Sequence, residues 1–223
     1  MEKIELNHVS KKFHRESILE DVCLKLFPGN IYGFIGPNGS GKTVLLKMIA
    51  GLMRPSGGTI YLDQKQIGKD LDFPPSMGVL IETPDFLPNY SGMQNLLYLA
   101  KIKKLVDREQ IMRTMKLVGI DYAAERKAGK YSLGMKQRLG IAQAIMEDPE
   151  LIILDEPMNG LDQRGIAEIR KLLLELKKNN KLILLASHTR EDMKMLCDQV
   201  FYIRDKKIDL KRVREEPYHK DLL

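Results

Sequence analysis

Short, uniformly apolar runs alternate with longer segments of helical periodicity along this chain. The segments IELNHV (4–9) and VCLKLF (22–27) alternate apolar and polar residues, which is typical of strands with one solvent-facing side. IYGFI (31–35), LIIL (151–154) and KLILLA (181–186) are short apolar runs, which predicts strands of a parallel sheet buried on both faces. The pattern therefore predicts an α/β fold with a mainly parallel sheet and an antiparallel edge sheet.

Helical periodicity fills the segments between these runs. TVLLKMIAGL (43–52) predicts a helix that ends at Gly51, and GIAEIRKLLLELKK (165–178) predicts an amphipathic helix. The chain from about residue 96 to residue 146 is predicted to be nearly all helical, with Asp107 and Gln110 forming a capping box. One domain is expected, with residues 1–82 and 146–223 as the α/β core and residues 83–145 as a helical insert.

Composition narrows the class of protein. The chain has 223 residues, of which 43% are hydrophobic and 30% charged, as in soluble globular proteins. We find neither a secretion signal at the start nor a window near the ~20 apolar residues of a membrane span. Cys23 and Cys197, both flanked by apolar residues, are expected to be reduced core thiols of a cytoplasmic protein.

The basic balance of the chain permits an anionic partner. Net charge is +6 and the pI is about 9.1, which would suit nucleic acid or the inner membrane face. The lysines are spread along the chain beside acidic residues, however, which favours solvated helix faces over a binding patch. The densest basic run is KRVR at 211–214.

The strongest local signal is GPNGSGKT, which lies between the predicted strand 31–35 and the predicted helix after it. It fits the phosphate-binding loop pattern, in which glycines let successive N–H groups point at phosphates. Lys42 can neutralise the β- and γ-phosphates, and the Thr43 hydroxyl can ligate Mg²⁺. A glycine-rich turn with a stray lysine is the alternative, which the strand–loop–helix context disfavours. The predicted nucleotide-binding loop comprises Gly36, Pro37, Asn38, Gly39, Ser40, Gly41, Lys42 and Thr43.

Polar residues also follow the other two buried strands. Asp155 and Glu156 come directly after LIIL, and His188 follows KLILLA. Ligands bind α/β sheets at the carboxyl ends of their strands. Asp155 is therefore predicted to hold Mg²⁺ beside Thr43, Glu156 to deprotonate a water, and His188 to hydrogen-bond a γ-phosphate. Acids of an ordinary loop and a structural histidine are the alternatives, and the shared sheet edge favours catalysis.

The string YSLGMKQR (131–138) predicts a helix start with an unusual glycine. Ser132 is a candidate N-cap, and Gly134 would lie in the first helical turn, where glycine costs about 1 kcal/mol relative to alanine. Free N–H groups at a helix start attract anions. We therefore expect an anion to approach Gly134 closely.

The order of these motifs resembles that of the ATP-binding cassette (ABC) family, the ATPase subunits of ABC transporters, over nearly the whole chain. GPNGSGKT is similar to Walker A, LIILDE to Walker B, YSLGMKQR to the signature (usually LSGGQ), and NGLD, which ends at Asp162, to the D-loop. The resemblance implies a P-loop NTPase core with an antiparallel β subdomain and an inserted helical signature lobe, and it makes His188 the switch histidine. It also places Phe13 where the family stacks an aromatic on adenine. A core position is the alternative, but the neighbours of Phe13 are polar.

The same resemblance implies that two cassettes close head to tail around ATP. Ser132 and Gly134 would then touch the γ-phosphate of ATP held by the other protomer. Leu133 and Met135 depart from the signature glycine and glutamine, which leaves the strength of closure open. Glu82 stands where the family's Q-loop has glutamine, and it is expected to act as a charged Mg²⁺ ligand, with a solvent-facing strand end as the alternative.

The segment GVLIETPDFLPNYSGMQNL resembles the branch of the family that handles bacitracin, lantibiotics and related peptides. The expected function is ATP hydrolysis that drives a separate permease, which exports or confers resistance to a peptide antibiotic. ATP and Mg²⁺ are the expected cofactors, and a homodimer bound to the inner face of the cell membrane is the expected assembly. Residues near 82–100 are expected to contact the permease through the apolar cluster PDFLPNY (84–90). The alternative is that this cluster packs within the helical lobe. The alternative is a soluble ATPase of this family that acts on a nucleic-acid or ribosomal partner, although nucleic acid is not expected.

Overall fold

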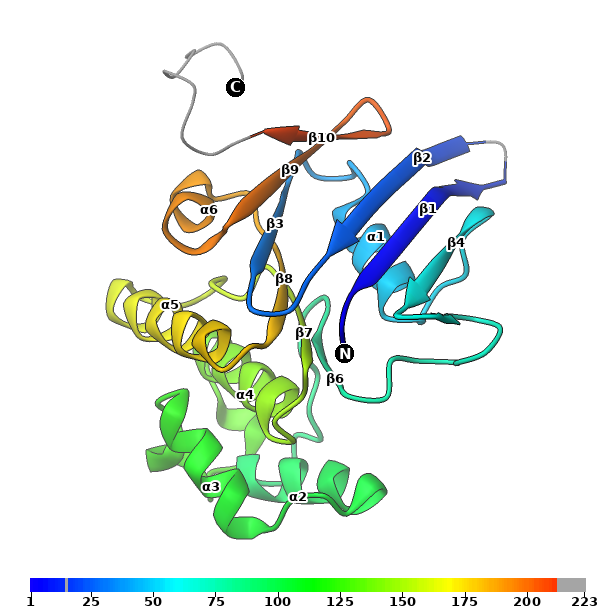
Figure 1. The fold of residues 1–223 in the computed structure, drawn as a ribbon. Helices are drawn as coiled ribbons and strands as arrows, with labels where there is room; N and C mark the ends of the chain where they lie inside the picture. Colours follow the sequence, from blue (N-terminus) through cyan, green and yellow to red (C-terminus); the bar gives the residue numbers. More distant parts are fainter. Residues whose placement is uncertain (15, 212–223) are drawn as a thin grey trace.

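A computed structural model describes residues 1–14 and 16–211 of the chain. Its strands form a four-stranded sheet in the order β2-β1-β4-β5 and a six-stranded sheet in the order β10-β9-β3-β8-β7-β6 (Figure 1). The basic run KRVR (211–214) falls, apart from its first residue, outside the described residues. The bounds of the strands are β1 (Ile4–Phe13), β2 (Glu16–Leu26), β3 (Ile31–Ile35), β4 (Gly57–Leu62), β5 (Lys65–Gln66), β6 (Met77–Leu80), β7 (Leu151–Asp155), β8 (Leu182–Ala186), β9 (Gln199–Arg204) and β10 (Lys207–Lys211).

Most helices fall where the periodicity of the sequence predicts them, but α6 was not predicted. They are α1 (Lys42–Ile49), α2 (Gly92–Lys103), α3 (Arg108–Leu117), α4 (Leu133–Ile145), α5 (Gln163–Lys178) and α6 (Arg190–Leu196), with short 3₁₀ turns at Asp121–Ala123 and Ala128–Lys130. Three helices, α2, α3 and α4, lie between β6 and β7 in the sequence. In Figure 1, α2 and α3 lie at the bottom, on the opposite side of the molecule from β1 and β2.

The predicted parallel arrangement of the three apolar strands is confirmed. β8 pairs in parallel with both β3 and β7, and only β10 runs antiparallel in the six-stranded sheet. The first two strands pair with each other antiparallel in the smaller sheet, also as predicted. A mixed, mainly parallel sheet and a separate antiparallel sheet are therefore both present.

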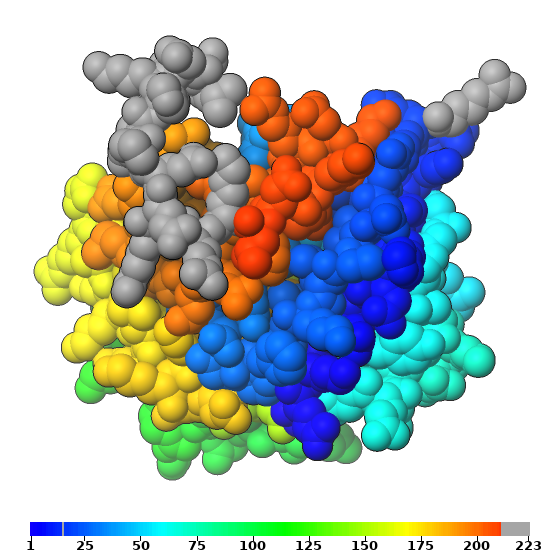
Figure 2. All heavy atoms as spheres, turned by 45° about the horizontal axis from the view of Figure 1, so that its top comes forward, coloured from blue at the N-terminus to red at the C-terminus, as the bar shows by residue number. Residues whose placement is uncertain are grey.

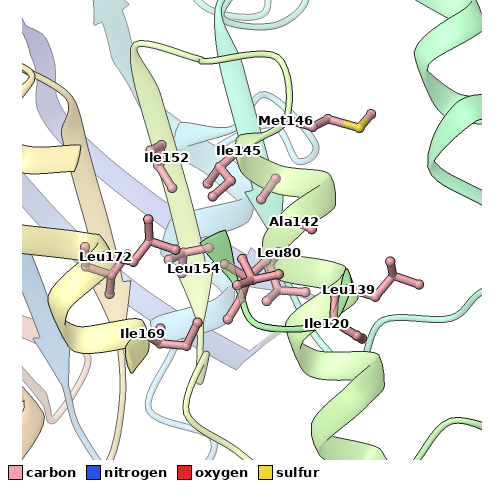
Figure 3. Close-up of a cluster of buried hydrophobic side chains, with 14 of the residues drawn as sticks. Leu80, Ile120, Leu139, Ala142, Ile145, Met146, Ile152, Leu154, Ile169 and Leu172 are labelled. Atoms are coloured by element: carbon pink, nitrogen blue, oxygen red, sulfur yellow. The ribbon is translucent and has the colours of Figure 1, made fainter. Parts of the chain in front are cut away.

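Two hydrophobic clusters cover the two faces of the parallel sheet. Successive side chains of a strand point to opposite faces, so the apolar run of β7 supplies both clusters. Leu151 and Ile153 pack with α1 and the antiparallel sheet, whereas Ile152 and Leu154 pack with α4 and α5. Figure 3 shows Ile152 and Leu154 among side chains of these two helices. This two-sided burial explains why the strand contains no polar alternation.

Two local predictions were wrong. Asp107 caps α3 by accepting a hydrogen bond from the Gln110 amide at 2.8 Å, but the Gln110 side chain accepts from Arg113 instead of completing a capping box. The complete capping box starts α2, between Ser91 and Gln94.

The second error concerns the cysteines. Both are free thiols, but Cys23 is exposed. It lies on the outer face of β2, where an apolar residue on each side gives no information about burial. Cys197 is half-buried, and burial raises the pKa of its thiol to about 12.

Candidate nucleotide-binding and hydrolysis site

The loop GPNGSGKT connects β3 to α1, as the sequence predicts. Gly39 and Gly41 have φ angles of 80° and 105°, in the region that only glycine enters without strain. Lys42 is buried, and its ammonium donates hydrogen bonds to the carbonyls of Gly36 (2.6 Å) and Pro37 (3.1 Å). An ammonium has three donors, so one donor of Lys42 remains for a phosphate oxygen.

Thr43 and Asp155 meet at the centre of the site although 112 residues separate them in the sequence. The Thr43 hydroxyl donates a hydrogen bond of 2.5 Å to the Asp155 carboxylate. Burial raises the pKa of Asp155 above its usual value, while the Thr43 hydrogen bond lowers it and the neighbouring Glu156 raises it further. A buried carboxylate beside a hydroxyl provides the hard oxygen ligands that Mg²⁺ prefers, so these two residues fit such a cation.

Glu156 is held in a conformation that is uncommon for residues other than glycine. Its φ angle is 50°, and such a residue persists only where its surroundings fix it. Its amide donates to the Ala186 carbonyl at 2.8 Å, and its own carbonyl accepts from the Asn159 amide at 3.1 Å. Nδ1 of His188 lies 2.9 Å from both oxygens of the Glu156 carboxylate. The predicted base and the predicted switch histidine are therefore paired directly.

One cleft of about 560 Å³ brings most of the predicted residues together. Phe13, which is 41% exposed, lies at this cleft with the ammonium of Lys11 5.0 Å from its ring centroid. Gly36, Pro37 and His188 adjoin the cleft through the hydrogen bonds described above. The predicted residues that line it are Phe13, Asn38, Gly39, Ser40, Gly41, Lys42, Thr43, Glu82, Asp155 and Glu156.

Glu82 lines the cleft, but its carboxylate already has a cationic partner. Lys47 of α1 lies 2.5 Å from it, and the Glu82 side chain is 64% exposed. The backbone of Glu82 has a φ angle of 65°. The side chain of Glu82 therefore faces solvent, as the alternative expects, but it also forms an ion pair that the alternative did not include.

Ser132 caps α4 as predicted, accepting a hydrogen bond of 3.2 Å from the Met135 amide. Gly134 has a reason for its missing side chain within the same chain: a Cβ there would lie 2.5 Å from the carbonyl oxygen of Gly160. Asp162, in the predicted D-loop, caps α5 by accepting from the Gly165 amide at 2.8 Å. Both motifs therefore have structural roles in one protomer.

Sequence reasoning missed Gln137. This residue of α4 is 4% exposed, lines the cleft and donates a hydrogen bond of 3.0 Å from Nε2 to the Glu156 carbonyl. Its signal in the sequence is a single amide within YSLGMKQR, and amides are common in solvated helices. Leu133, which stands where the family signature has a glycine, also lines the cleft and packs against Gly160 of the D-loop.

With this geometry established, comparison with known proteins identifies the family. Residues 19–159 match the family model described as ABC transporter. The chain is 42% identical over 195 residues to the uncharacterised ABC transporter ATP-binding protein YybJ of Bacillus subtilis, covering 87% of this chain and 89% of YybJ. It is 37% identical over 207 residues to the bacitracin transport ATP-binding protein BcrA of Bacillus licheniformis, covering 92% of this chain and 68% of BcrA. The chain belongs to the ABC transporter family.

The fold agrees with this assignment. The structure described as the dimeric post-hydrolysis state of the ATP-binding cassette MJ0796 with ADP and Pi superposes with a TM-score of 0.85 at 22% identity, covering 96% of this chain and all of that one. The predicted P-loop NTPase fold and the predicted class of enzyme, an ABC-type ATP hydrolase, are confirmed. Within residues 1–14 and 16–211, no helix combines the length and the apolar character that a membrane crossing needs.

Proposed function

We propose that this chain binds and hydrolyses ATP as one of two identical cassettes and thereby powers a separate membrane permease. The observation that carries the proposal is the convergence of Thr43, Asp155 and Glu156 on one cleft, with His188 paired to Glu156 beside it. The chain forms one nucleotide-binding domain, with residues 1–82 and 146–223 as its core and residues 83–145 as its signature lobe. Residues 212–223 belong to the proposed core but are not among those described.

Each side chain of the cleft has a part in the proposed reaction. Phe13 stacks on adenine, and the amides and the ammonium of Lys42 hold the phosphates. Thr43 and Asp155 would hold Mg²⁺, with Glu82 as a further ligand once it leaves Lys47; when bound, this ion neutralises phosphate charge. Glu156 takes a proton from the attacking water, and His188 orients that water and the γ-phosphate. The 2.9 Å contact between Glu156 and His188 keeps the base aimed until substrate arrives.

The second cassette supplies the signature. Ser132 is exposed at the start of α4, where unpaired amides and the helix dipole favour a phosphate of the partner's ATP. Gly160 and Leu161 of the D-loop pack beside that helix start. We propose that ATP therefore forms part of the contact between the two protomers, and that hydrolysis loosens it.

The cargo is proposed to be a peptide antibiotic, which the permease exports or to which it confers resistance. Two observations support this cargo: the sequence LIETPDFLPNYSGMQNL and the 37% identity to a bacitracin transport ATP-binding protein. The permease holds the chain at the inner face of the membrane through residues near 82–100. Leu87 and Tyr90 in this segment are 47% and 46% exposed, which suits a protein contact.

The test of this function is Glu156→Gln, which keeps the shape and polarity of the side chain but removes its basicity. A positioned general base supplies roughly 10²–10⁴-fold in rate, so turnover should fall by that factor while ATP still binds. The variant should accumulate as an ATP-held dimer in size-exclusion chromatography. Glu109→Gln, on the exposed face of α3, is the matched control. Near-normal turnover of the Glu156 variant would refute the role of this residue.

A further inference from the structure

On the outer face of the antiparallel sheet, three different metal-ligating side chains converge, none of which lines the nucleotide cleft. They are His8 of β1 and Asp21 and Cys23 of β2, and all three are exposed. One ligand atom from each lies within 4.8 Å of the other two. Figure 2 shows the face on which these two strands (blue) form the surface of the molecule beside β9 and β10 (orange).

Two β-bulges on opposite strands create this convergence. Leu6 pairs with Leu24 and Val9 with Val22, so two residues of β1, the second of them His8, lie opposite Cys23 alone. At the next shift, Val9 pairs with Val22 and Lys11 with Leu19, so two residues of β2, one of them Asp21, lie opposite a single residue of β1. Bulges are known to redirect a side chain locally. Here each bulge turns its residue toward the same side, above the buried Val9–Val22 pair.

The backbone of both bulge residues is unusual. His8 and Asp21 have φ angles of 52° and 54°, a region that residues with a side chain enter uncommonly. Nδ1 of His8 lies 2.6 Å from Oδ1 of Asp21, and the His8 amide donates a hydrogen bond of 3.3 Å to Sγ of Cys23. The Asp21 amide donates to the Ser10 hydroxyl at 3.0 Å. The three side chains are therefore oriented before any ligand binds.

We propose that His8, Asp21 and Cys23 form a binding site for a divalent transition metal, with Zn²⁺ as the best match. Zn²⁺ binds thiolate sulfur, imidazole nitrogen and carboxylate oxygen, and its ligand atoms lie roughly 3–4 Å apart. Separations of at most 4.8 Å reach that geometry by small side-chain rotations. Binding releases the proton of the Cys23 thiol, because the thiolate is the ligand. A water completes the coordination.

The soft sulfur donor separates this site from the proposed ATPase site. Thr43, Asp155 and Glu82 offer oxygen only, which suits Mg²⁺, whereas one thiolate and one imidazole select Zn²⁺ or Co²⁺. The two sites can therefore be tested independently. A metal at His8 also joins β1 to β2 within the hairpin that carries Phe13 at its end, so binding stabilises that hairpin.

Cobalt(II) is the spectroscopic probe, added to the nucleotide-free full-length protein. We expect one equivalent to give a thiolate-to-cobalt charge-transfer band in the near ultraviolet. Cys23→Ser and His8→Ala should abolish or strongly weaken the band, and Asp21→Asn, which tolerates the same backbone conformation, should weaken binding. Cys197→Ala is the matched cysteine control and should keep the band, because Cys197 is not one of the three converging ligands and burial raises the pKa of its thiol to about 12.

A second measurement needs no variant. Zn²⁺ should slow modification of Cys23 by a thiol reagent roughly tenfold or more, since the bound thiolate is no longer free to react. Peptide mapping assigns the modified cysteine, and Cys197 should stay unmodified with or without Zn²⁺. A charge-transfer band that persists in Cys23→Ser, or an unchanged rate of Cys23 modification with Zn²⁺, would overturn the proposal. Either result leaves the ATPase assignment untouched.

Discussion

Replacing Gln137 by leucine should lower ATP turnover about fivefold while leaving the KM for ATP within about twofold. About 1 kcal/mol of lost restraint on Glu156 corresponds to roughly that factor in rate. The substitution keeps a buried side chain of similar volume and removes one donor. That donor is Nε2, which bonds to the Glu156 carbonyl at 3.0 Å and ties the signature helix α4 to the predicted base. Gln137 itself is a positioning residue, since its bond reaches the backbone of Glu156.

The magnitude follows from the way in which Glu156 is held. Its left-handed backbone conformation costs of order 1–3 kcal/mol, which the surrounding hydrogen bonds must offset. The carbonyl would keep its bond from the Asn159 amide, and the Glu156 amide would keep its bond to Ala186. Losing one neutral hydrogen bond of the set removes about 1 kcal/mol of restraint. We therefore expect partial misplacement of the carboxylate, well short of the loss caused by Glu156→Gln.

The assay is steady-state ATPase activity with kcat and KM determined separately, together with thermal unfolding. A lost hydrogen bond of about 1 kcal/mol should lower Tm by only about 2–4 °C in a chain of this size. Gln143→Leu makes the same chemical change on the same helix at a half-buried position away from the cleft. Equal kcat values for the two variants, or a loss that appears in KM, would show that Gln137 does not position the base.

Two further predictions concern the signature and the Q-loop. Gly134→Asp should abolish hydrolysis while nucleotide binding by one protomer barely changes. Gly134→Ala is the control, because it places a Cβ 2.5 Å from the Gly160 carbonyl oxygen without adding a charge. If alanine lowers hydrolysis as much as aspartate does, packing against the D-loop is the cause. Glu82→Gln should raise the Mg²⁺ concentration needed for half-maximal ATPase activity. Lys47→Gln, which removes the other partner of the 2.5 Å ion pair, should not raise it. Superimposable Mg²⁺ titrations of ATPase activity for the Glu82 variant and the parent would exclude the ligand role.

Local motifs could be predicted because their chemistry depends on neighbours in the sequence. The phosphate-binding loop needs only glycines that allow positive φ, a lysine and a threonine, in fixed order between a strand and a helix. Ser132 could be recognised as a helix N-cap for the same reason, whereas the cap formed by Asp162 was not predicted. Likewise, apolar runs without polar alternation reveal strands that are covered on both faces.

Contacts between distant segments were accessible only where buried strands end at the same sheet edge, as for Thr43 and Asp155. Nothing near Gln137 in the sequence indicates that its amide reaches Glu156, and nothing near Glu82 indicates Lys47 as its partner. The exposure of Cys23 depends on the register of two strands, and one bulge changes which face a side chain occupies.

The sequence alone therefore determined the phosphate-binding loop, the three buried strands and the larger helices, and the acids and the histidine that follow two of those strands. These features depend on residue type and on spacing between residues close together in the sequence, and both can be read without the tertiary structure. Only the tertiary structure decided which polar groups meet, because hydrogen bonds and ion pairs depend on positions to within an ångström. Gly134 illustrates the difference: its place in the signature is visible in the sequence, but the carbonyl of Gly160 that excludes a side chain there is brought to it by the packing of α4 against the D-loop.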